Sequence, residues 1–209
     1  MTKDSRRLLL RAKCAGAVHR AVALAVLVTA APLLVIVALA ILVTSGRPII
    51  FKQTRVGQFG APFTILKFRT MRPDAELELL HQATASTAEL APYRKPAADP
   101  RITRIGKLLR VTSLDELPQL LNVARGEMAL VGPRPLVAYE SALCPAWSNT
   151  RLLVKPGMTG LWQVSGRSDV SAEQALRLDV EYVQSRCWRV DLSILVRSVV
   201  VPLRRQGAR

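Results

Sequence analysis

Two adjacent carboxylates, Asp115 and Glu116, lie in the segment of this chain that is richest in chemistry, TSLDELPQL at residues 112–120. The pattern predicts that they open a helix, and a helix N-terminus keeps a carboxylate ionised, as a nucleophile or a metal ligand must be. Pro118 restricts Leu117 and leaves one carbonyl unpaired, which a helix made only for packing does not need. The pair is a candidate catalytic dyad and metal-binding site.

The same spacing has a purely structural interpretation. Ser113 followed by Glu116 fits a capping box, in which the Glu116 side chain bonds back to the Ser113 amide. Acids in a first helical turn also offset the helix dipole. Spacing alone favours this capping interpretation, so the catalytic hypothesis depends on what else lies near the pair.

Basic side chains on turns and element ends form the second set of candidates. Arginine presents a fixed fork of donors that matches phosphate oxygens. Arg134, held between two prolines, has little backbone freedom, which suits a preorganised anion clamp. A lone surface arginine is usually just solvated, but several beside paired acids favour a phosphate site. The candidates are Lys67, Arg69, Arg101, Arg104, Arg110 and Arg134.

A third stretch, KPGMTGLWQVSGR at residues 155–167, places three glycines and a proline around Trp162 and Gln163. It predicts a loop that shapes a pocket, although an ordinary turn around a buried tryptophan explains it equally well.

The chain has no Walker A loop, GxGxxG or GxSxG, which excludes the common nucleotide-phosphate loops and the nucleophile elbow. Two histidines and three scattered cysteines make neither a zinc site nor a disulfide scaffold.

Charge is distributed unevenly along the 209 residues, whose formal net charge is +15. Six basic residues and one acid precede residue 21, and residues 44–72 hold six basic residues and no acid. A pI near 11 makes a nucleic-acid binder the first alternative. Basic flanks around an apolar run fit an anionic membrane surface better.

Residues 21–43 carry no charge. A helix of this length measures roughly 35 Å, enough to cross a bilayer core and too long for a signal peptide. Pro32, in the middle, predicts either a kinked spanning helix or a re-entrant segment whose ends lie on the same face. The equally basic flanks favour the re-entrant form, because a spanning helix should be more basic on its cytoplasmic side.

The remaining sequence predicts a mostly α fold with a small β-hairpin, one domain on a membrane anchor. Residues 49–56 and 63–69 form the two strands, joined by a glycine- and proline-rich turn. A proline-rich loop covers residues 91–103, and the final helix combines apolar residues with arginines, so we expect it on the bilayer surface. Helices are expected at residues 74–90, 105–110, 114–123, 137–143, 172–184 and 192–201.

Several of these segments together resemble the bacterial sugar transferases, the monotopic polyprenyl-phosphate hexose-1-phosphate transferases. They occur in the family's order and span about residues 14–195. Any one alone is a weak signal, and the combination is specific. The segments are the apolar run with Pro32, FKQTRVG (51–57), KFRTM (67–71), DPRITRIG (99–106), TSLDELPQL (112–120), GPRP (132–135) and KPGMTGLWQVSGR (155–167).

The resemblance implies a re-entrant helix–break–helix anchor at residues 1–45 and a cytoplasmic catalytic domain at residues 46–209, on the inner membrane. It implies transfer of a hexose-1-phosphate from a UDP-sugar to undecaprenyl phosphate with release of UMP, the first step of exopolysaccharide or related glycoconjugate synthesis. Asp115 would be the nucleophile that forms a covalent phosphosugar. Glu116 would assist as base or metal ligand, and both carboxylates would hold Mg²⁺.

By the same resemblance, the phosphate- and substrate-binding residues are Lys67, Arg69, Arg101, Arg110, Arg134 and Gln163. The LWQVSGR stretch resembles members that use UDP-galactose or UDP-glucose, while the sequence names neither the sugar nor the pathway. The chain departs from the family's pattern in the anchor, where His19 replaces a frequent Asp and Ala31 a frequent Ser, and in a thinned aromatic stretch between Tyr182 and Trp188.

Two other functions stay open at this stage. A membrane-anchored basic protein that binds nucleic acid or anionic lipid without catalysis would explain the charge, although residues 73–185 are nearly balanced. A conventional glycosyltransferase would move the sugar alone and release UDP. We expect UDP-sugar, undecaprenyl phosphate and the membrane as partners, and no nucleic acid. A homodimer is neither indicated nor excluded.

Overall fold

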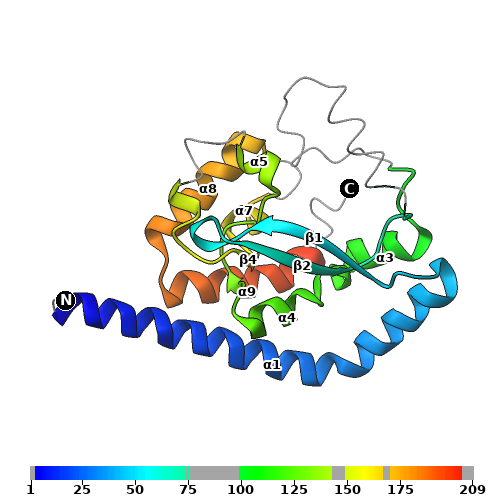
Figure 1. The fold of residues 1–209 in the computed structure, drawn as a ribbon, viewed down its shortest axis with the longest axis horizontal. Coiled ribbons are helices and arrows are strands. Elements are labelled where there is room, and N and C mark those ends of the chain that lie inside the picture. The colour runs from blue at the N-terminus through cyan, green and yellow to red at the C-terminus, as the bar shows by residue number, and fades with distance from the viewer. Residues whose placement is uncertain (1–2, 74, 76–98, 143–148, 167–169, 204–209) are drawn as a thin grey trace.

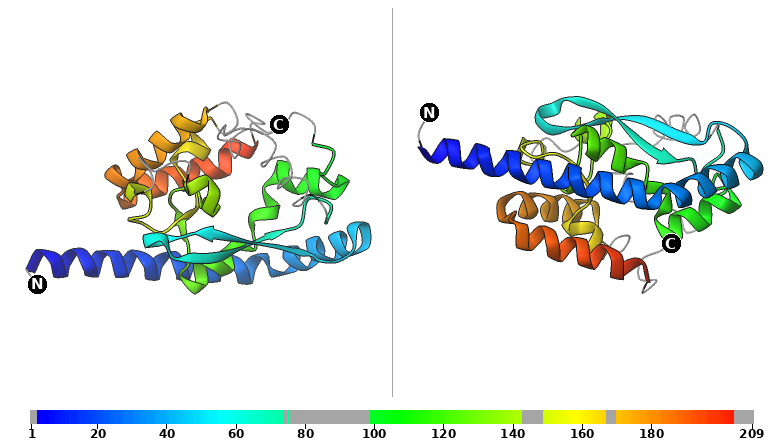
Figure 2. Two further views of the ribbon diagram at one scale, coloured as in Figure 1. Left: turned by 45° about the horizontal axis from the view of Figure 1, so that its top comes forward. Right: turned by 90° about the horizontal axis from the view of Figure 1, so that it is seen from below.

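The computed structural model describes residues 3–73, 75, 99–142, 149–166 and 170–203. A long N-terminal helix, α1 (Lys3–Ser45), runs along one side of the molecule, and the other described elements lie to one side of it (Figures 1 and 2). The expected mostly helical fold with a small hairpin is confirmed. The predicted helix at residues 74–90 and most of the loop at 91–103 lie outside the described residues.

The β-hairpin is formed by β1 (Ile50–Val56) and β2 (Pro62–Phe68), paired antiparallel with Phe51 opposite Lys67. A short 3-10 turn, η1 (Gln58–Gly60), joins them at the predicted turn. Both strands agree with the sequence prediction to within a residue. Because side chains alternate across a strand, Phe63 and Ile65 enter one core cluster, while Phe68 enters another.

Helix α1 is the one described helix long and apolar enough to cross a membrane, over Ala15–Ser45. It stays helical through Pro32, so the expected helix–break–helix is one continuous helix that bends along its length (Figure 1). Only 11% of its most apolar window is buried within the protein. Among residues 15–45 of α1, the buried side chains are those of Ala23, Val37 and Ile41, which pack into the core.

The segment that holds the paired acids is divided where one helix was expected. Helix α3 (Arg104–Thr112) ends at Ser113, whose φ of 57° is left-handed and whose N–H bonds back to Arg110 and Leu109. The 3-10 turn η3 (Leu114–Glu116) follows, and α4 (Gln119–Arg125) begins only after Pro118. The proline therefore starts a new helix instead of lying within one.

This division corrects the capping-box prediction. Ser113 makes no side-chain cap bond. It is the left-handed C-terminal cap of α3, and only its backbone carbonyl bonds to η3, accepting the Glu116 N–H at 3.3 Å. Glu116 bonds to a lysine of the hairpin instead of the Ser113 amide. The S-x-x-E spacing fits both a capping box and a glutamate that bonds to a distant lysine, so spacing alone could not distinguish them.

A second, parallel two-stranded sheet was not predicted. Strand β3 (Ala129–Val131) pairs with β4 (Gly157–Thr159), and each has only three residues, too few for a periodic signal. Gly157 is required there, because a Cβ would lie 2.1 Å from the Gly132 nitrogen. The close approach holds the Gly-Pro-Arg-Pro turn against the 155–160 segment.

The remaining helices pack around this small sheet. They are α5 (Ala138–Ala142), α7 (Leu161–Val164), α8 (Ala172–Ser185) and α9 (Trp188–Leu203). Helix α7 lies in a stretch expected to be loop, while the other three agree with prediction. Helix α9 buries Ile194 and exposes an i, i+4, i+8 stripe of Trp188, Leu192 and Val196. This stripe has the form expected of a helix on a bilayer surface.

Candidate functional site

The candidate site centres on an ion pair between the hairpin and the paired acids. The Lys67 ammonium lies 2.7 Å from a Glu116 carboxylate oxygen. Lys67 lies on β2 and Glu116 lies on η3, 49 residues later in the sequence. Both side chains keep partial exposure, 20% and 32%, so the pair stays open to a ligand. This contact favours the catalytic interpretation of the acids.

Asp115 is half-buried beside this pair, and its carboxyl is harder to ionise than usual. Burial and then the negative charge of Glu116 raise its pKa from 3.8 to about 6, while Lys67 and Arg110 oppose the rise. Among the described residues, Asp115 thus lies near one like charge, Glu116, and two cations, Lys67 and Arg110. A carboxyl with a pKa of about 6 is mostly ionised near neutral pH, and a carboxyl perturbed by burial and charged partners is a functional-site candidate.

Arg110 reaches the site from α3 and is fixed by the end of the hairpin. Its Nε donates to the Thr70 hydroxyl at 2.9 Å. Burial lowers the pKa of Arg110, and the nearby carboxylates of Asp115 and Asp99 oppose that shift. The structure therefore brings together Asp115, Glu116, Lys67 and Arg110, the four sequence candidates that form one charged cluster.

Arg101 and Arg69, two other predicted phosphate ligands, both bond to groups within the protein, and Arg101 lies close enough to Arg110 to lower the pKa of Arg110. Arg101 is buried and donates through Nε and Nη2 to the Asp99 carboxylate, at 2.8 and 2.7 Å. Arg69 is also buried, and its guanidinium donates to the carbonyls of residues 45–47 at the end of α1. The bonds of Arg69 tie α1 to the domain. Phosphate binding by either arginine stays a prediction.

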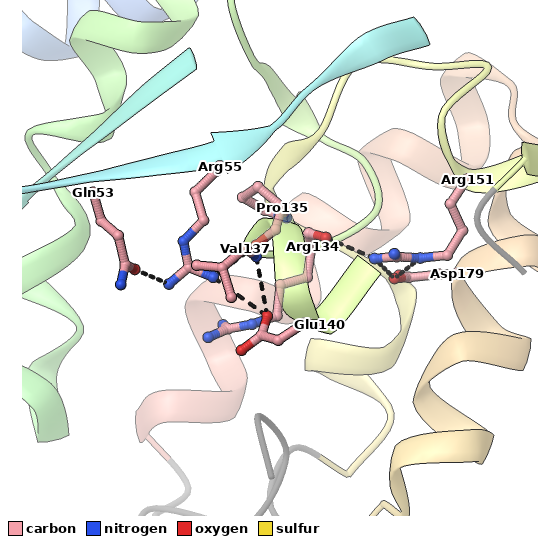
Figure 3. A network of polar contacts seen from close by, with 8 residues as sticks. All are labelled: Gln53, Arg55, Arg134, Pro135, Val137, Glu140, Arg151 and Asp179. Atoms are coloured by element: carbon pink, nitrogen blue, oxygen red, sulfur yellow. Dashed lines mark hydrogen bonds and ion pairs between the residues drawn. The ribbon is translucent and has the colours of Figure 1, made fainter. Parts of the chain in front are cut away.

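The Pro-Arg-Pro turn is held from both sides by guanidinium groups, the buried one of Arg151 and the partly buried one of Arg55 (Figure 3). Arg151 donates to the Arg134 carbonyl at 2.6 Å, and Arg55 donates to the Pro135 carbonyl at 3.2 Å. Each is in turn paired with a carboxylate, Arg151 with Asp179 on α8 and Arg55 with Glu140 on α5. The turn that carries the Arg134 side chain is therefore rigidly positioned.

The Arg134 guanidinium lies over the Trp162 ring, 5.9 Å from its centroid. Its buried Nε has no hydrogen-bond partner among the described residues, and neither has the Gln163 side-chain oxygen. The Gln163 side-chain amide donates a hydrogen bond to the Met158 carbonyl at 3.2 Å. Buried polar atoms without a partner are uncommon in folded proteins, and two on neighbouring side chains make this a candidate functional position. Arg167, the last residue of this motif, lies outside the described residues.

Sequence reasoning missed the residues that brace the turn. Asp179 is fully buried and Arg151 is 5% exposed. The available signal was the position of Asp179 on the apolar face of its helix, in line with Leu176 and Tyr182. A charge in a core stripe requires a buried partner. Nothing in the sequence indicated that the partner would be Arg151.

His19, the residue that replaces a frequent Asp of the resembling family, connects α1 to the domain. Its Nδ1 accepts the Leu130 N–H at 3.0 Å, and its Nε2 lies 3.9 Å from an Asp191 oxygen. The other Asp191 oxygen accepts the Tyr182 hydroxyl at 2.7 Å. His19 therefore makes a polar link between α1, β3 and α9.

The family model described as "Bacterial sugar transferase" matches residues 11–205, and this chain belongs to that family. It is 45% identical over 166 residues to "Undecaprenyl-phosphate galactose phosphotransferase" of Salmonella typhimurium, covering 78% of this chain and 35% of that protein. It is 44% identical over 179 residues to "UDP-glucose:undecaprenyl-phosphate glucose-1-phosphate transferase" of Caulobacter vibrioides, covering 81% of this chain and 62% of that protein.

A third relative is closer in length. "Exopolysaccharide production protein ExoY" of Sinorhizobium fredii is 40% identical over 181 residues, which cover 85% of this chain and 80% of that protein. The chain thus spans about a third of the Salmonella protein and most of the ExoY protein. The matched region includes the charged cluster, the Pro-Arg-Pro turn and the apolar helix.

Proposed function

We propose that this chain transfers a hexose-1-phosphate from a UDP-sugar to undecaprenyl phosphate and releases UMP. The observation that carries the proposal is the cluster of Asp115, Glu116, Lys67 and Arg110, in a chain of this family. Relatives are named for galactose and glucose phosphate transfer to the same lipid. The product would begin an exopolysaccharide or related glycoconjugate.

In the first step, an Asp115 carboxylate oxygen attacks the phosphorus that carries the sugar. The bond from that phosphorus to the bridging oxygen breaks, and UMP leaves with the bond's electron pair. In the second step, a phosphate oxygen of undecaprenyl phosphate attacks the same phosphorus and restores the carboxylate. One phosphoanhydride is exchanged for another, so no external energy source is needed.

The cations of the cluster have distinct tasks in this scheme. Lys67 and Arg110 oppose the burial and the Glu116 charge that make Asp115 hard to ionise, so they favour the nucleophilic form. Arg134, on its braced turn, would hold a phosphate of the donor. Fixed donors aimed at developing phosphoryl charge are a large source of rate enhancement.

The residues fit the Mg²⁺ that the family resemblance implies. Magnesium is usually held by one or two carboxylates together with substrate phosphates, and Asp115 and Glu116 offer that number. Among the described residues, no group of three or more His, Cys, Asp or Glu side chains forms a site without substrate. When bound, Mg²⁺ would neutralise phosphate charge during transfer.

The membrane arrangement belongs to the same proposal. Exposed apolar residues on α1 and the stripe on α9 would contact the bilayer, and the basic flanks would contact its anionic headgroups. Although α1 is one continuous helix, it bends along its length (Figure 1), and we propose that this bend makes it re-entrant, with both ends on the cytoplasmic face of the inner membrane. The domain could then meet a soluble donor and a lipid-bound acceptor.

Nucleotide release tests the proposed reaction. The purified chain would be incubated with undecaprenyl phosphate, Mg²⁺ and a panel of UDP-sugars that includes galactose and glucose, beside Asp115→Asn. We expect UMP from the wild type with one donor and none from the variant. UDP would indicate sugar transfer without phosphate. No nucleotide with any donor, together with salt-dependent RNA or DNA binding, would favour the non-catalytic alternative.

A further inference from the structure

A groove of about 500 Å³ lies where α1 ends and the hairpin begins. Its apolar lining comes from Ile49, Ile50 and Leu66. Leu66 is buried, and the two isoleucines pack against the cluster of Ile41, Phe68 and Leu109. The floor of the groove is therefore part of the folded core and is formed before any ligand binds.

Three cations border this apolar floor. They are Arg47 after α1, Lys52 on β1 and Arg125 at the last position of α4, and all three are exposed. In the described part of the chain, no carboxylate lines the groove or pairs with their charged groups. The groove thus combines hydrocarbon surface with unneutralised positive charge.

The groove lies on the other face of the hairpin from the candidate active site. Lys52 pairs with Leu66, and the next residue of β2, Lys67, carries the bond to Glu116. Consecutive residues of a strand point to opposite faces. A phosphate bound among Arg47, Lys52 and Arg125 is therefore separated from Asp115 by the hairpin, which argues against a reacting substrate.

The position of the groove relates it to the bilayer. Arg47 follows directly on the apolar stretch Ala15–Ser45, so the cations lie where a membrane helix would leave the hydrocarbon for the headgroup region. Anionic lipids attract such cations, and an amphiphile satisfies the apolar floor and the charged rim together. A soluble anion would leave the floor unoccupied.

We propose that this groove binds one anionic glycerophospholipid of the surrounding bilayer, its phosphate between Arg47, Lys52 and Arg125 and the first part of its chains on Ile49, Ile50 and Leu66. The lipid would fix the hairpin at the membrane surface. This inference does not depend on the proposed reaction, because its site shares no residue with the charged cluster.

Native mass spectrometry of the detergent-purified full chain tests the proposal. The wild type is titrated with dioleoyl phosphatidylglycerol and, separately, with dioleoyl phosphatidylcholine, which has the same chains and a zwitterionic head. We expect phosphatidylglycerol to bind about tenfold more tightly or better, from three nearby cations. Equal affinities would overturn the proposal without the need for any variant.

Two double variants separate the groove from net charge. Lys52→Gln with Arg125→Gln removes two rim cations, and Lys107→Gln with Arg177→Gln removes two exposed cations elsewhere. We expect the first pair to weaken phosphatidylglycerol binding about tenfold and the second less than about twofold. An equal loss from both pairs, or none from the first, would overturn the groove as the site.

Competition distinguishes the bilayer lipid from the acceptor substrate. Undecaprenyl phosphate is added at equal concentration to the complex with phosphatidylglycerol. We expect both lipids to be bound at once, because they occupy opposite faces of the hairpin. One-for-one displacement would assign the groove to the acceptor and overturn the phospholipid proposal.

Discussion

The Lys67 ammonium and the Glu116 carboxylate, 49 residues apart in sequence, lie 2.7 Å from each other. This contact joins the hairpin to the turn that carries both acids. It exists because Ser113 ends α3 in a left-handed conformation and Pro118 delays α4, which leaves Asp115 and Glu116 on a separate 3-10 turn. The local backbone thus directs the acids to the hairpin instead of along a helix.

Replacing Lys67 tests the value of this contact for catalysis. Lys67→Met leaves Glu116 without its lysine and removes one of two cations near Asp115, so we expect kcat/KM to fall about 10²-fold. Lys67→Arg keeps the charge and should recover part of the loss. Initial rates of UMP release measure both. Lys107→Met, at an exposed lysine outside both the charged cluster and the groove, is the matched control, and equal loss from both changes would contradict the role of Lys67.

Arg55 is predicted to act as a positioning residue for the Pro-Arg-Pro turn. It donates to the Pro135 carbonyl and lies 3.6 Å from Glu140, so Arg55→Met frees one side of the turn. We expect kcat/KM to fall about tenfold, mainly through a higher KM for the UDP-sugar, because Arg134 is held less precisely in place. Steady-state kinetics separate KM from kcat. A loss confined to thermal stability, with unchanged KM, would make Arg55 structural only.

Breaking the buried Arg151–Asp179 pair should give a pH-dependent loss of stability. Burial raises the pKa of Asp179 from 3.8 to about 6, and Arg151 opposes the rise. Arg151→Met therefore moves the folded-state pKa still higher. A carboxyl whose pKa is raised in the folded state stabilises the protein fully when the pH is below about 4, the pKa of the unfolded chain. That stabilisation is lost as the pH rises through the pKa of the folded state. The variant's deficit should be about 3–5 kcal/mol at pH 7.5 and smaller at pH 5.

Denaturant unfolding in detergent at both pH values measures that deficit. The control is Arg177→Met, which breaks an exposed pair with Glu173 whose side chains are 65% and 63% accessible. We expect its effect to stay under about 1 kcal/mol at both pH values. A deficit for Arg151→Met that does not shrink at pH 5 would show that Asp179 is not the group responsible.

The re-entrant arrangement of α1 predicts that residues 10 and 60 lie on the same face of the membrane. Leu10→Cys and Ala61→Cys are placed singly in a chain whose native cysteines are replaced by serine. Ala61 serves for position 60 because Gly60 has a φ of +80° that a side chain would strain. An impermeant maleimide should label neither site in intact cells and both after lysis. Labelling of one site only in intact cells would identify a spanning helix.

Strong local signals predicted most of the secondary structure. The β-branched runs correctly predicted β1 and β2, and helical periodicity correctly predicted α3, α5 and α8 to within two residues at each end. Helix α9 was predicted too, but it begins four residues earlier than expected. The short parallel pair β3 and β4 was missed because three residues carry no period. The split between η3 and α4 was missed because the apolar periodicity of residues 114–123 continues through Pro118, where the helix was expected to be unbroken.

The sequence predicted which residues form the candidate site, but not which partners each of the basic residues binds in the fold. Residue types and spacing indicated Asp115, Glu116, Lys67 and Arg110, which meet in one cluster. Sequence could not show that Arg69 and Arg101 bond within the fold, because an arginine is equally suited to a carbonyl, a carboxylate or a phosphate. The partnership of Arg151 and Asp179 depends on long-range topology, which no local pattern encodes.

The central claim is that Asp115 becomes covalently attached to the sugar phosphate. Intact-mass spectrometry of the full chain after incubation with its UDP-sugar and Mg²⁺, without undecaprenyl phosphate, tests it most directly. We predict a species heavier by one hexose phosphate, mapped to residue 115, absent from Asp115→Asn and discharged when undecaprenyl phosphate is added. UMP formed only when both substrates are present, with no such species in the wild type, would contradict the covalent route.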